Sequence, residues 1–402
     1  ENGGFSIAGQ NDRYNQILID GVTNKDAFGL TAGGVPGGQA GAKMLPIDAV
    51  AQYEILVAPF DVRLSGFTGG VMNAVTKTGT NDWNLRAFGV GRHEALMGDL
   101  SLPTGLVNAT GVDRSLFGFS AGGPIIRDRA HFFISTEFEE RRQPPTGFNL
   151  LRDAPSLVQV TDESMGAFQQ LFQNQFGVDT GLSGPYALEQ DLANIFARVD
   201  ATVAQGHRLT ARTVLASANN EEAPNRAAFE PYELSSNAVL RNSQTTNTSI
   251  QLFSELGARG GNELEFSIQR TTDETTPSSP WPQVEVELRS PVGNGTSYSR
   301  AVRAGSQFFA QENDLVQTSY RFQNTVTLPT QGGSTYTLGL LASLNSVEHQ
   351  YLPGSKGDFY FASMDDVANN APSRYQRTVL LPGQAPAVDF SVLEWGGYIQ
   401  NE

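Results

Sequence analysis

The sequence lacks several residue types, and each absence excludes a class of protein. It contains no cysteine, so neither disulfide bonds nor thiolate metal sites can form within it. Basic residues are scarce, because 27 Lys and Arg stand against 42 Asp and Glu and the formal net charge is −15. Binding to phosphates needs concentrated Lys and Arg, so we expect no nucleic-acid partner.

Two further absences concern membranes and export. No stretch approaches the roughly 18 to 20 consecutive apolar residues of a membrane-spanning helix. That test does not apply to β-barrels, whose strands alternate lipid-facing and lumen-facing residues. The chain opens with ENGGFSIAGQ, without an initiator methionine or the apolar core of a signal peptide. Any export signal would therefore lie outside this sequence.

After Trp83 the sequence alternates apolar and polar residues over long stretches, a pattern typical of β-strands with two different faces. In LANIFARVDATV, for example, only Phe196 interrupts the polar row. The same period of two recurs in the segments 192–203, 248–256, 263–270, 317–328 and 334–345. The chain has 42 glycines, frequent Thr, Ser and Asn, and only 27 Lys and Arg, so long amphipathic helices are poorly supported and the composition favours strands and turns.

The connections between these stretches alternate in length. Short turns are predicted at 126–129, 204–207, 258–262 and 330–334, and long polar connections at about 143–190, 219–243, 273–314 and 351–388. Strands of about ten or more residues with short turns at one end and long loops at the other are typical of an outer-membrane β-barrel. The alternative is a string of β-sandwich domains, but sandwich strands are usually shorter and their loops lack this asymmetry.

The polar row indicates the width of the barrel. A narrow barrel fills its interior with packed side chains, whereas a wide one holds water or a plug and tolerates inward charges. Because the row contains Arg, Asp and Glu, we expect a wide barrel, with about nine complete long strands after Trp83 and the start of another.

The first 82 residues consist of short segments in place of long alternating stretches, and they predict a small mixed α+β unit. Pro46 and Asp48 indicate a brief helix that runs into a strand. The segment GGVMNAVTKTG predicts a half-buried strand closed by Gly79. We therefore divide the chain into residues 1–82 and 83–402.

Motifs for catalysis or metal binding are weak. GFSAG matches the nucleophile elbow around Ser120, but Pro124 and a turn follow it where a helix is needed. The 4 histidines lie in separate predicted strands or turns, so no zinc site is expected. Four acidic pairs in the predicted loops could bind Ca²⁺, although a solvated loop is the commoner explanation: Asp162 and Glu163, Glu221 and Glu222, Asp273 and Glu274, and Asp365 and Asp366. We expect no enzyme, no cofactor and no resident metal.

Three N-terminal segments resemble a known family. ILIDGVTNKDAFGL, DAVAQYEILVAPFDVR and GFTGGVMNAVTKTGTNDW are similar to runs in the TonB-dependent outer-membrane receptors, in particular their Oar-like branch. Weaker similarity extends to GDFYFASMDDVANNAPSRYQRT and DFSVLEWGGYIQNE. One departure is that typical receptors carry an Arg-Gly-Pro run where this chain has Val57, Ala58 and Pro59, so no role of that arginine is carried over.

The resemblance implies a plug domain followed by a transmembrane antiparallel β-barrel of about 22 strands, of which about ten are present. The chain would then be a fragment, since an open sheet in a bilayer leaves unpaired backbone groups at its edges. The implied function is energy-driven import of an unknown extracellular ligand across the outer membrane of a Gram-negative-type bacterium. The implied partners are outer-membrane lipid and a periplasmic transducer of the TonB type. A surface adhesin and a passive porin remain alternatives.

Candidate site residues follow from this resemblance. Candidate ligand contacts, for which ordinary loop packing is the alternative, are Phe28, Leu30, Val35, Gln39, Trp281, Tyr298 and Tyr351. Residues expected to hold the plug together or in place are Asp20, Arg63, Gly69, Gly70, Lys77 and Gly79.

Overall fold

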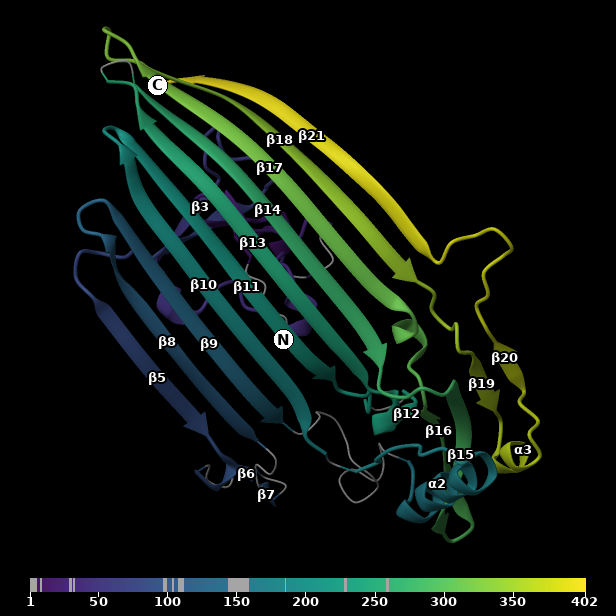
Figure 1. The fold of residues 1–402 in the computed structure, drawn as a ribbon. Helices are drawn as coiled ribbons and strands as arrows, with labels where there is room; N and C mark the ends of the chain where they lie inside the picture. Colours follow the sequence, from purple (N-terminus) through teal and green to yellow (C-terminus); the bar gives the residue numbers. More distant parts are fainter. Residues whose placement is uncertain are drawn as a thin grey trace.

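The computed structural model of the chain describes residues 6–7, 9–28, 31, 33–96, 100–102, 105–107, 112–143, 159–184, 186–227, 230–257 and 260–402. Its dominant feature is a curved, ten-stranded antiparallel sheet, here called the wall (Figure 1). In spatial order the wall contains β21 (Ala387–Asn401), β18 (Thr335–Tyr351), β17 (Asn313–Pro329), β14 (Gly261–Pro277), β13 (Val239–Glu255), β11 (His207–Glu222), β10 (Leu188–Ala204), β9 (Ala130–Gln143), β8 (Asp113–Ile126) and β5 (Asn84–Arg92).

The wall has the two chemically different faces that the alternation predicts. On β10 the polar row turns inward, with Asn194 3% and Arg198 9% exposed, while Val199 in the other row is 39% exposed. The same holds on β14, where Glu265 is buried and its neighbour Phe266 is exposed. The outward face is apolar and the inward face is polar, as the sequence predicts for a wide barrel.

The two ends of the wall differ as predicted. Tight turns join β8 to β9, β10 to β11, β13 to β14, and β17 to β18 at one end. All long connections leave from the other end (Figure 1). Within the described residues β5 and β21 each pair with one wall strand only, so the sheet does not close into a complete barrel.

A second, four-stranded sheet is formed by the N-terminal residues, and we call residues 6–82 the N-terminal unit. Its order is β2 (Val22–Thr23), β1 (Gln16–Ile19), β4 (Gly70–Thr76) and β3 (Val50–Val57), with β1 and β4 parallel. Short 3-10 helices occur at Asp12–Tyr14, Gly38–Ala40 and Ile47–Ala49, and the last runs directly into β3 as predicted. The unit lies against the inward face of the wall (Figure 1).

The long connections do not remain irregular. Parts of them fold into a separate unit, here called the loop unit, at the open-loop end of the wall (Figure 1). Its sheet has the order β12 (Tyr232–Glu233), β16 (Thr296–Ala304), β15 (Gln283–Gly293), β19 (Asp358–Phe361) and β20 (Arg374–Gln376). Helices α2 (Asp162–Phe176) and α3 (Met364–Ala368) pack on it. Shorter elements of the connections occur at Ser235–Asn237 and Phe308–Ala310, and at Glu94–Leu96, Leu100–Leu102 and Gly105–Val107, of which the last two form a separate pair of strands below β5 (Figure 1).

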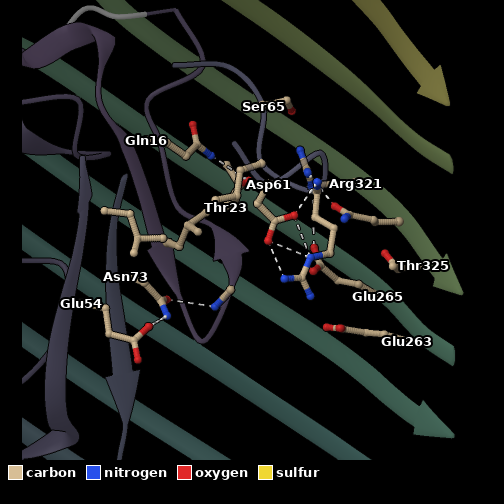
Figure 2. A pocket seen from close by; sticks show the side chains of 16 residues that line it. Gln16, Thr23, Glu54, Asp61, Ser65, Asn73, Glu263, Glu265, Arg321 and Thr325 are labelled. Atoms are coloured by element: carbon tan, nitrogen blue, oxygen red, sulfur yellow. Dashed lines mark hydrogen bonds and ion pairs between the residues drawn. The ribbon is translucent and has the colours of Figure 1, made fainter. Parts of the chain in front are cut away.

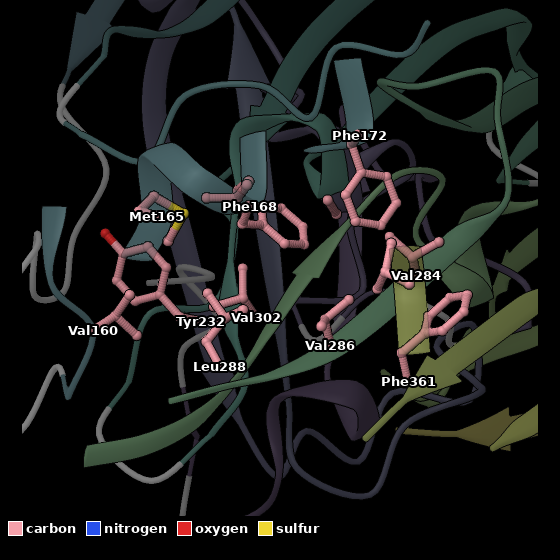
Figure 3. Close-up of a cluster of buried hydrophobic side chains, with 13 residues drawn as sticks. Val160, Met165, Phe168, Phe172, Tyr232, Val284, Val286, Leu288, Val302 and Phe361 are labelled. Atoms are coloured by element: carbon pink, nitrogen blue, oxygen red, sulfur yellow. The ribbon is translucent and has the colours of Figure 1, made fainter. Parts of the chain in front are cut away.

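The loop unit has a core of its own. Phe168 and Phe172 of α2 pack with Val286, Leu288 and other buried apolar residues from four connections (Figure 3). Thr161 caps α2 by accepting a hydrogen bond from the Ser164 amide, and Gly177 ends the helix with a φ of 67°. The prediction of long polar loops was therefore incomplete, because apolar residues scattered over these segments condense into one core.

The acidic pairs assigned to loops lie in regular elements instead. Asp162 and Glu163 occupy the first turn of α2, and Asp365 and Asp366 that of α3, where they face the positive end of the helix dipole. The other two pairs lie in β11 and β14. No helix among the described residues is long and apolar enough to cross a membrane.

Candidate functional site between the N-terminal unit and the wall

The centre of the interface is a buried ionic cluster around Asp20. This residue occupies the turn between β1 and β2 with a φ of 49°, and its carboxylate accepts hydrogen bonds from the Thr76 amide and hydroxyl at 2.8 Å each. From the wall, Arg198 Nη1 lies 3.2 Å and Arg212 Nε 3.7 Å from the same carboxylate. The Arg212 side chain is fully buried and also donates to the Ile19 carbonyl at 2.7 Å.

The cluster is tied further into the wall. Arg198 makes a two-point contact with Asp200 at 2.7 and 2.8 Å, which fixes the plane of its guanidinium group. Its Nη1 also donates to the Thr76 hydroxyl at 2.8 Å. Arg198 would keep Asp200 as a partner if Asp20 were removed, but the fully buried Arg212 would lose the carboxylate that lies within 4 Å of it among the described residues.

A second ionic contact lies between Lys43 and β9. Lys43 Nζ is 2.7 Å from Glu137 and 2.5 Å from Glu139, and Arg114 of β8 also pairs with Glu139 at 2.6 Å. The Ile47 amide donates to Glu137 at 3.0 Å. Burial lowers the pKa of Lys43, but the hydrogen bonds and attraction from the two glutamates outweigh burial, so its pKa lies above the ordinary value.

A third contact accounts for Ser120. Its hydroxyl donates to Asp48 of the N-terminal unit at 2.9 Å, and Arg86 and Lys77 approach the same carboxylate at 2.8 and 3.5 Å. Ser120 lies within β8, with strand on both sides of it. The nucleophile-elbow geometry, which needs a strand-to-helix turn, is therefore absent at this serine.

In the described part of the chain, apolar contact is made at two patches, of which the smaller joins Ala40 to Leu192 and Ala218. Phe196, which interrupted the polar row in the sequence, is fully buried with Phe133 and Val214 of the wall against Ile19 and Leu45 of the N-terminal unit. The interruption of the alternation thus marks the place where the two hydrophobic surfaces meet.

A row of amides completes the contact. Asn247 donates to Asn24 at 3.1 Å, Gln251 to the Asp20 carbonyl at 3.3 Å, and Gln269 to the Lys25 carbonyl at 2.9 Å. These three side chains belong to the inward rows of β13 and β14. Burial lowers the pKa of Lys25, against the opposing attraction of Asp26.

Cavities remain between the N-terminal unit and the wall. One of about 230 Å³, here called the central cavity, lies between the 61–65 segment and strands β14 and β17 (Figure 2). A second of about 550 Å³ opens toward the tight turns, and a third of about 270 Å³ lies along β17, β18 and β21. The central cavity shares Arg63 with the second and Arg321 with the third.

Asp61 and Arg63 stand at this cavity. The Arg63 Nε donates to both Asp61 carboxylate oxygens at 2.9 and 3.0 Å. These hydrogen bonds hold the pKa of Asp61 below its usual range and raise that of Arg63. The pair is internal to the 61–65 segment. The Val62 amide of this segment donates a hydrogen bond to Gln400 of β21 at 3.1 Å.

The predicted structural glycines lie at close approaches. A Cβ at Gly79 would collide with the Phe132 backbone of β9, where the chain passes from the N-terminal unit to the wall. Gly69 lies against the Asn15 side chain and Gly70 against Ile7. Lys77 donates its amide to the Ala49 carbonyl at 2.8 Å.

The predicted ligand contacts are dispersed. Gln39 accepts from Arg241 of β13 at 3.2 Å, and Phe28 packs edge-on against Phe390 of β21. Val35 accepts a hydrogen bond from the Thr31 hydroxyl at its carbonyl. Leu30 lies outside the described residues.

The three aromatic candidates lie in or near the loop unit. Trp281 stacks against Phe172 beside the core, Tyr298 lies on β16, and Tyr351 ends β18, where its ring stacks on His349. The structure does not bring these three together with the N-terminal candidates into one contact group in the described part of the chain.

Sequence reasoning missed Lys43, Glu137 and Glu139. The two glutamates alternate on a strand, which signals an inward pair, but nothing in the sequence identifies their partner. Among the described residues, no group of three or more His, Asp or Glu side chains could hold a metal ion.

Comparison with known proteins agrees with this architecture. No family model matches the chain. It is 29% identical over 141 residues to the TonB-dependent transporter Oar of Myxococcus xanthus, a match that covers 33% of this chain and 12% of the relative. Among solved structures it is similar to the outer-membrane transporter YddB of Escherichia coli, with a TM-score of 0.62, 9% identity, and coverage of 98% of this chain and 47% of YddB.

A mutant of the ferric enterobactin receptor PfeA from Pseudomonas aeruginosa is also similar, with a TM-score of 0.55, 12% identity, and coverage of 100% of this chain and 49% of the receptor. The ten-stranded wall with a small mixed sheet against its polar face is thus the fold of a TonB-dependent outer-membrane receptor, present as a partial barrel. Within that class the curated match supports the Oar-like branch. The chain spans about half the length of these solved structures.

Proposed function

We propose that the chain forms the plug and the first part of the barrel of an outer-membrane receptor that binds an extracellular ligand and imports it. In this proposal residues 1–82 are the plug and residues 83–402 are the N-terminal portion of the barrel. The protein acts in the outer membrane of a Gram-negative-type bacterium, and a periplasmic transducer of the TonB type supplies the energy. It performs no catalytic step.

The observation that carries the proposal is the character of the contact between the N-terminal unit and the wall. Asp20, Lys43 and Asp48 connect the two through ion pairs and hydrogen bonds. When the plug moves, water reaches both partners of each pair, so each contact costs only the net value of a hydrogen bond to a charged group, about 1.5–3 kcal/mol. A plug held this way closes the lumen at rest and can still be moved by a pulling force.

The ligand contacts are proposed at the edge of the N-terminal unit and on the loop unit. Phe28, Val35 and Gln39 belong to the plug side of this surface, and Trp281, Tyr298 and Tyr351 to the outer side. Leu30 is proposed as a contact from the sequence alone. Siderophores are the first class to test, because the similar receptor PfeA is described as a ferric enterobactin receptor. Glycans, peptides and proteins are the next classes.

The test uses the full-length receptor in its host. Cells with and without the gene are compared for accumulation of iron-55 siderophores and then of labelled glycans and peptides, each with and without a protonophore. We expect accumulation that requires both the receptor and the proton-motive force. Uptake that persists with the protonophore would indicate a passive porin, and a receptor that is not heat-modifiable in outer-membrane fractions would contradict the barrel.

A further inference from the structure

The central cavity carries an excess of negative charge. Its 16 lining residues include four carboxylates and two guanidinium groups, so two negative charges are in excess: Glu54, Asp61, Glu263 and Glu265 against Arg63 and Arg321 (Figure 2). Glu54 is hydrogen-bonded to Gln52 and Asn73, which carry no charge. The cavity is therefore short of cations.

Among the lining carboxylates, Glu265 has a buried oxygen, Oε1, that lacks a hydrogen-bond partner within the described residues. The residue is 5% exposed. The nearest cation, Arg321 Nε, lies 3.7 Å away, beyond hydrogen-bond distance, and is itself without a hydrogen-bond partner in the described part of the chain. A buried carboxylate oxygen left in this state costs free energy that a bound donor would recover.

Glu263 lies on the same face two residues earlier in β14 and receives one long hydrogen bond, from Gln251 at 3.4 Å. Two positions along a strand separate side chains by about 6.6 Å. A group with several N–H donors can bridge two carboxylates at this spacing.

Arg63 shows how such a group fits. Its guanidinium stands at the boundary between the central and the second cavity, attracted by Glu263 but hydrogen-bonded to Asp61 of its own segment. The plug thus places a tethered guanidinium beside the glutamates, and half of that side chain is exposed.

We propose that Glu263 and Glu265 form a subsite for an organic cation, a guanidinium or primary ammonium group, in the passage between the plug and the wall. The subsite deepens the proposed function, because residues shared with the neighbouring cavities place it along a route that a moving ligand would follow. A ligand carrying such a group would pair with Glu265 and compete with Arg63 for Glu263.

These 402 residues contain no cysteine, so any cysteine elsewhere in the full-length receptor is first replaced by serine. Ser65 lines the central cavity and is close in size to cysteine, so Ser65→Cys places one thiol beside the glutamates. In the purified full-length receptor, its reaction rates with a cationic aminoethyl and an anionic sulfonatoethyl methanethiosulfonate are compared. Ser297→Cys, exposed on β16 of the loop unit, is the reference thiol.

We expect the ratio of cationic to anionic rate at position 65 to exceed that at position 297 by about tenfold. Glu263→Gln with Glu265→Gln should bring the two ratios together, whereas Glu348→Gln, an exposed glutamate on β18, should change neither. Methylguanidinium chloride should slow cationic labelling at position 65 more than sodium chloride at the same concentration.

Three results would overturn the subsite. The ratio of cationic to anionic labelling rate could be equal at positions 65 and 297, or the higher ratio at position 65 could persist after both glutamates are replaced by glutamine. Equal slowing of cationic labelling by methylguanidinium chloride and sodium chloride would indicate ionic screening alone. An unreactive Ser65→Cys would also contradict the subsite, because the cavity would then be closed to small cations. Heat modifiability of each variant confirms that it is folded. The labelling requires no energised uptake, so its outcome is separate from the test of the import function.

Discussion

At the scale of single residues, Asp20 is the side chain on which the contact between plug and wall depends most. Asp20→Asn removes the charge that faces Arg198 and Arg212 but keeps the size of the side chain. Breaking a buried ion pair on one side costs about 3 kcal/mol or more, so we expect a comparable loss in the free energy of unfolding of the plug. Urea-dependent proteolysis of the plug in the full-length receptor measures this loss.

Asp61→Asn is the matched control for that prediction. Asp61 and Arg63 are 30% and 50% exposed, and exposed pairs contribute about 1 kcal/mol or less. Equal effects of the two variants would show that the Asp20 cluster does not anchor the plug.

Lys43 gives a prediction for pH dependence. Its pKa in the folded protein lies above the ordinary value of 10.5, so its stabilising contribution is fully present below 10.5 and is lost as the pH rises through the higher folded pKa. Protease resistance of the plug should therefore fall more steeply above pH 10.5 in the unmodified receptor than in Lys43→Met. Parallel curves for the two proteins would exclude a contribution from Lys43.

At the scale of elements, the segment that connects β4 to β5 packs tightly against β9 at Gly79. Gly79→Ala would push a methyl group into the Phe132 backbone, and we expect a loss of about 1–3 kcal/mol and a lower yield of heat-modifiable receptor. Gly91→Ala on β5 meets open space and should be tolerated. An unchanged yield of heat-modifiable receptor from Gly79→Ala would mean that the connecting segment shifts away from β9 to make room for the methyl group.

We expect the loop unit to fold and unfold independently of the wall. Phe168 is fully buried in its core, so Phe168→Ala should cost about 3–5 kcal/mol and expose α2 to hydrogen exchange. Heat modifiability of the barrel should stay unchanged. The control, Phe176→Ala, truncates a 40% exposed ring in the same helix and should leave exchange in α2 near normal. Loss of the barrel together with α2 would contradict independent folding.

Elements differ in how far the sequence predicts them. The wall strands are predicted well, because an apolar outward face and a polar inward face impose a period of two on the sequence. The loop unit is missed, because its core gathers residues such as Phe168, Val286 and Phe361 from separate connections with no common period. In the interface, inward Arg198 is predictable from β10 alone, but its pairing with Asp20 depends on how the plug is seated.

At the scale of the whole molecule, the outward apolar row and the inward polar row define one curved wall around a plug. The central claim is that neighbouring residues on each wall strand face lipid and lumen in turn. Ala193 and Ala197 belong to the outward row of β10, and Asn194 and Thr202 to the inward row.

The most direct measurement uses single cysteines at these four positions, in a full-length receptor whose cysteines outside these 402 residues, if any, are replaced by serine. Each carries a fluorescent label in the full-length receptor in a bilayer that contains spin-labelled lipids. We predict strong quenching at Ala193 and Ala197 and little at Asn194 and Thr202. Equal quenching at all four positions, or quenching of the inward pair, would contradict the wall.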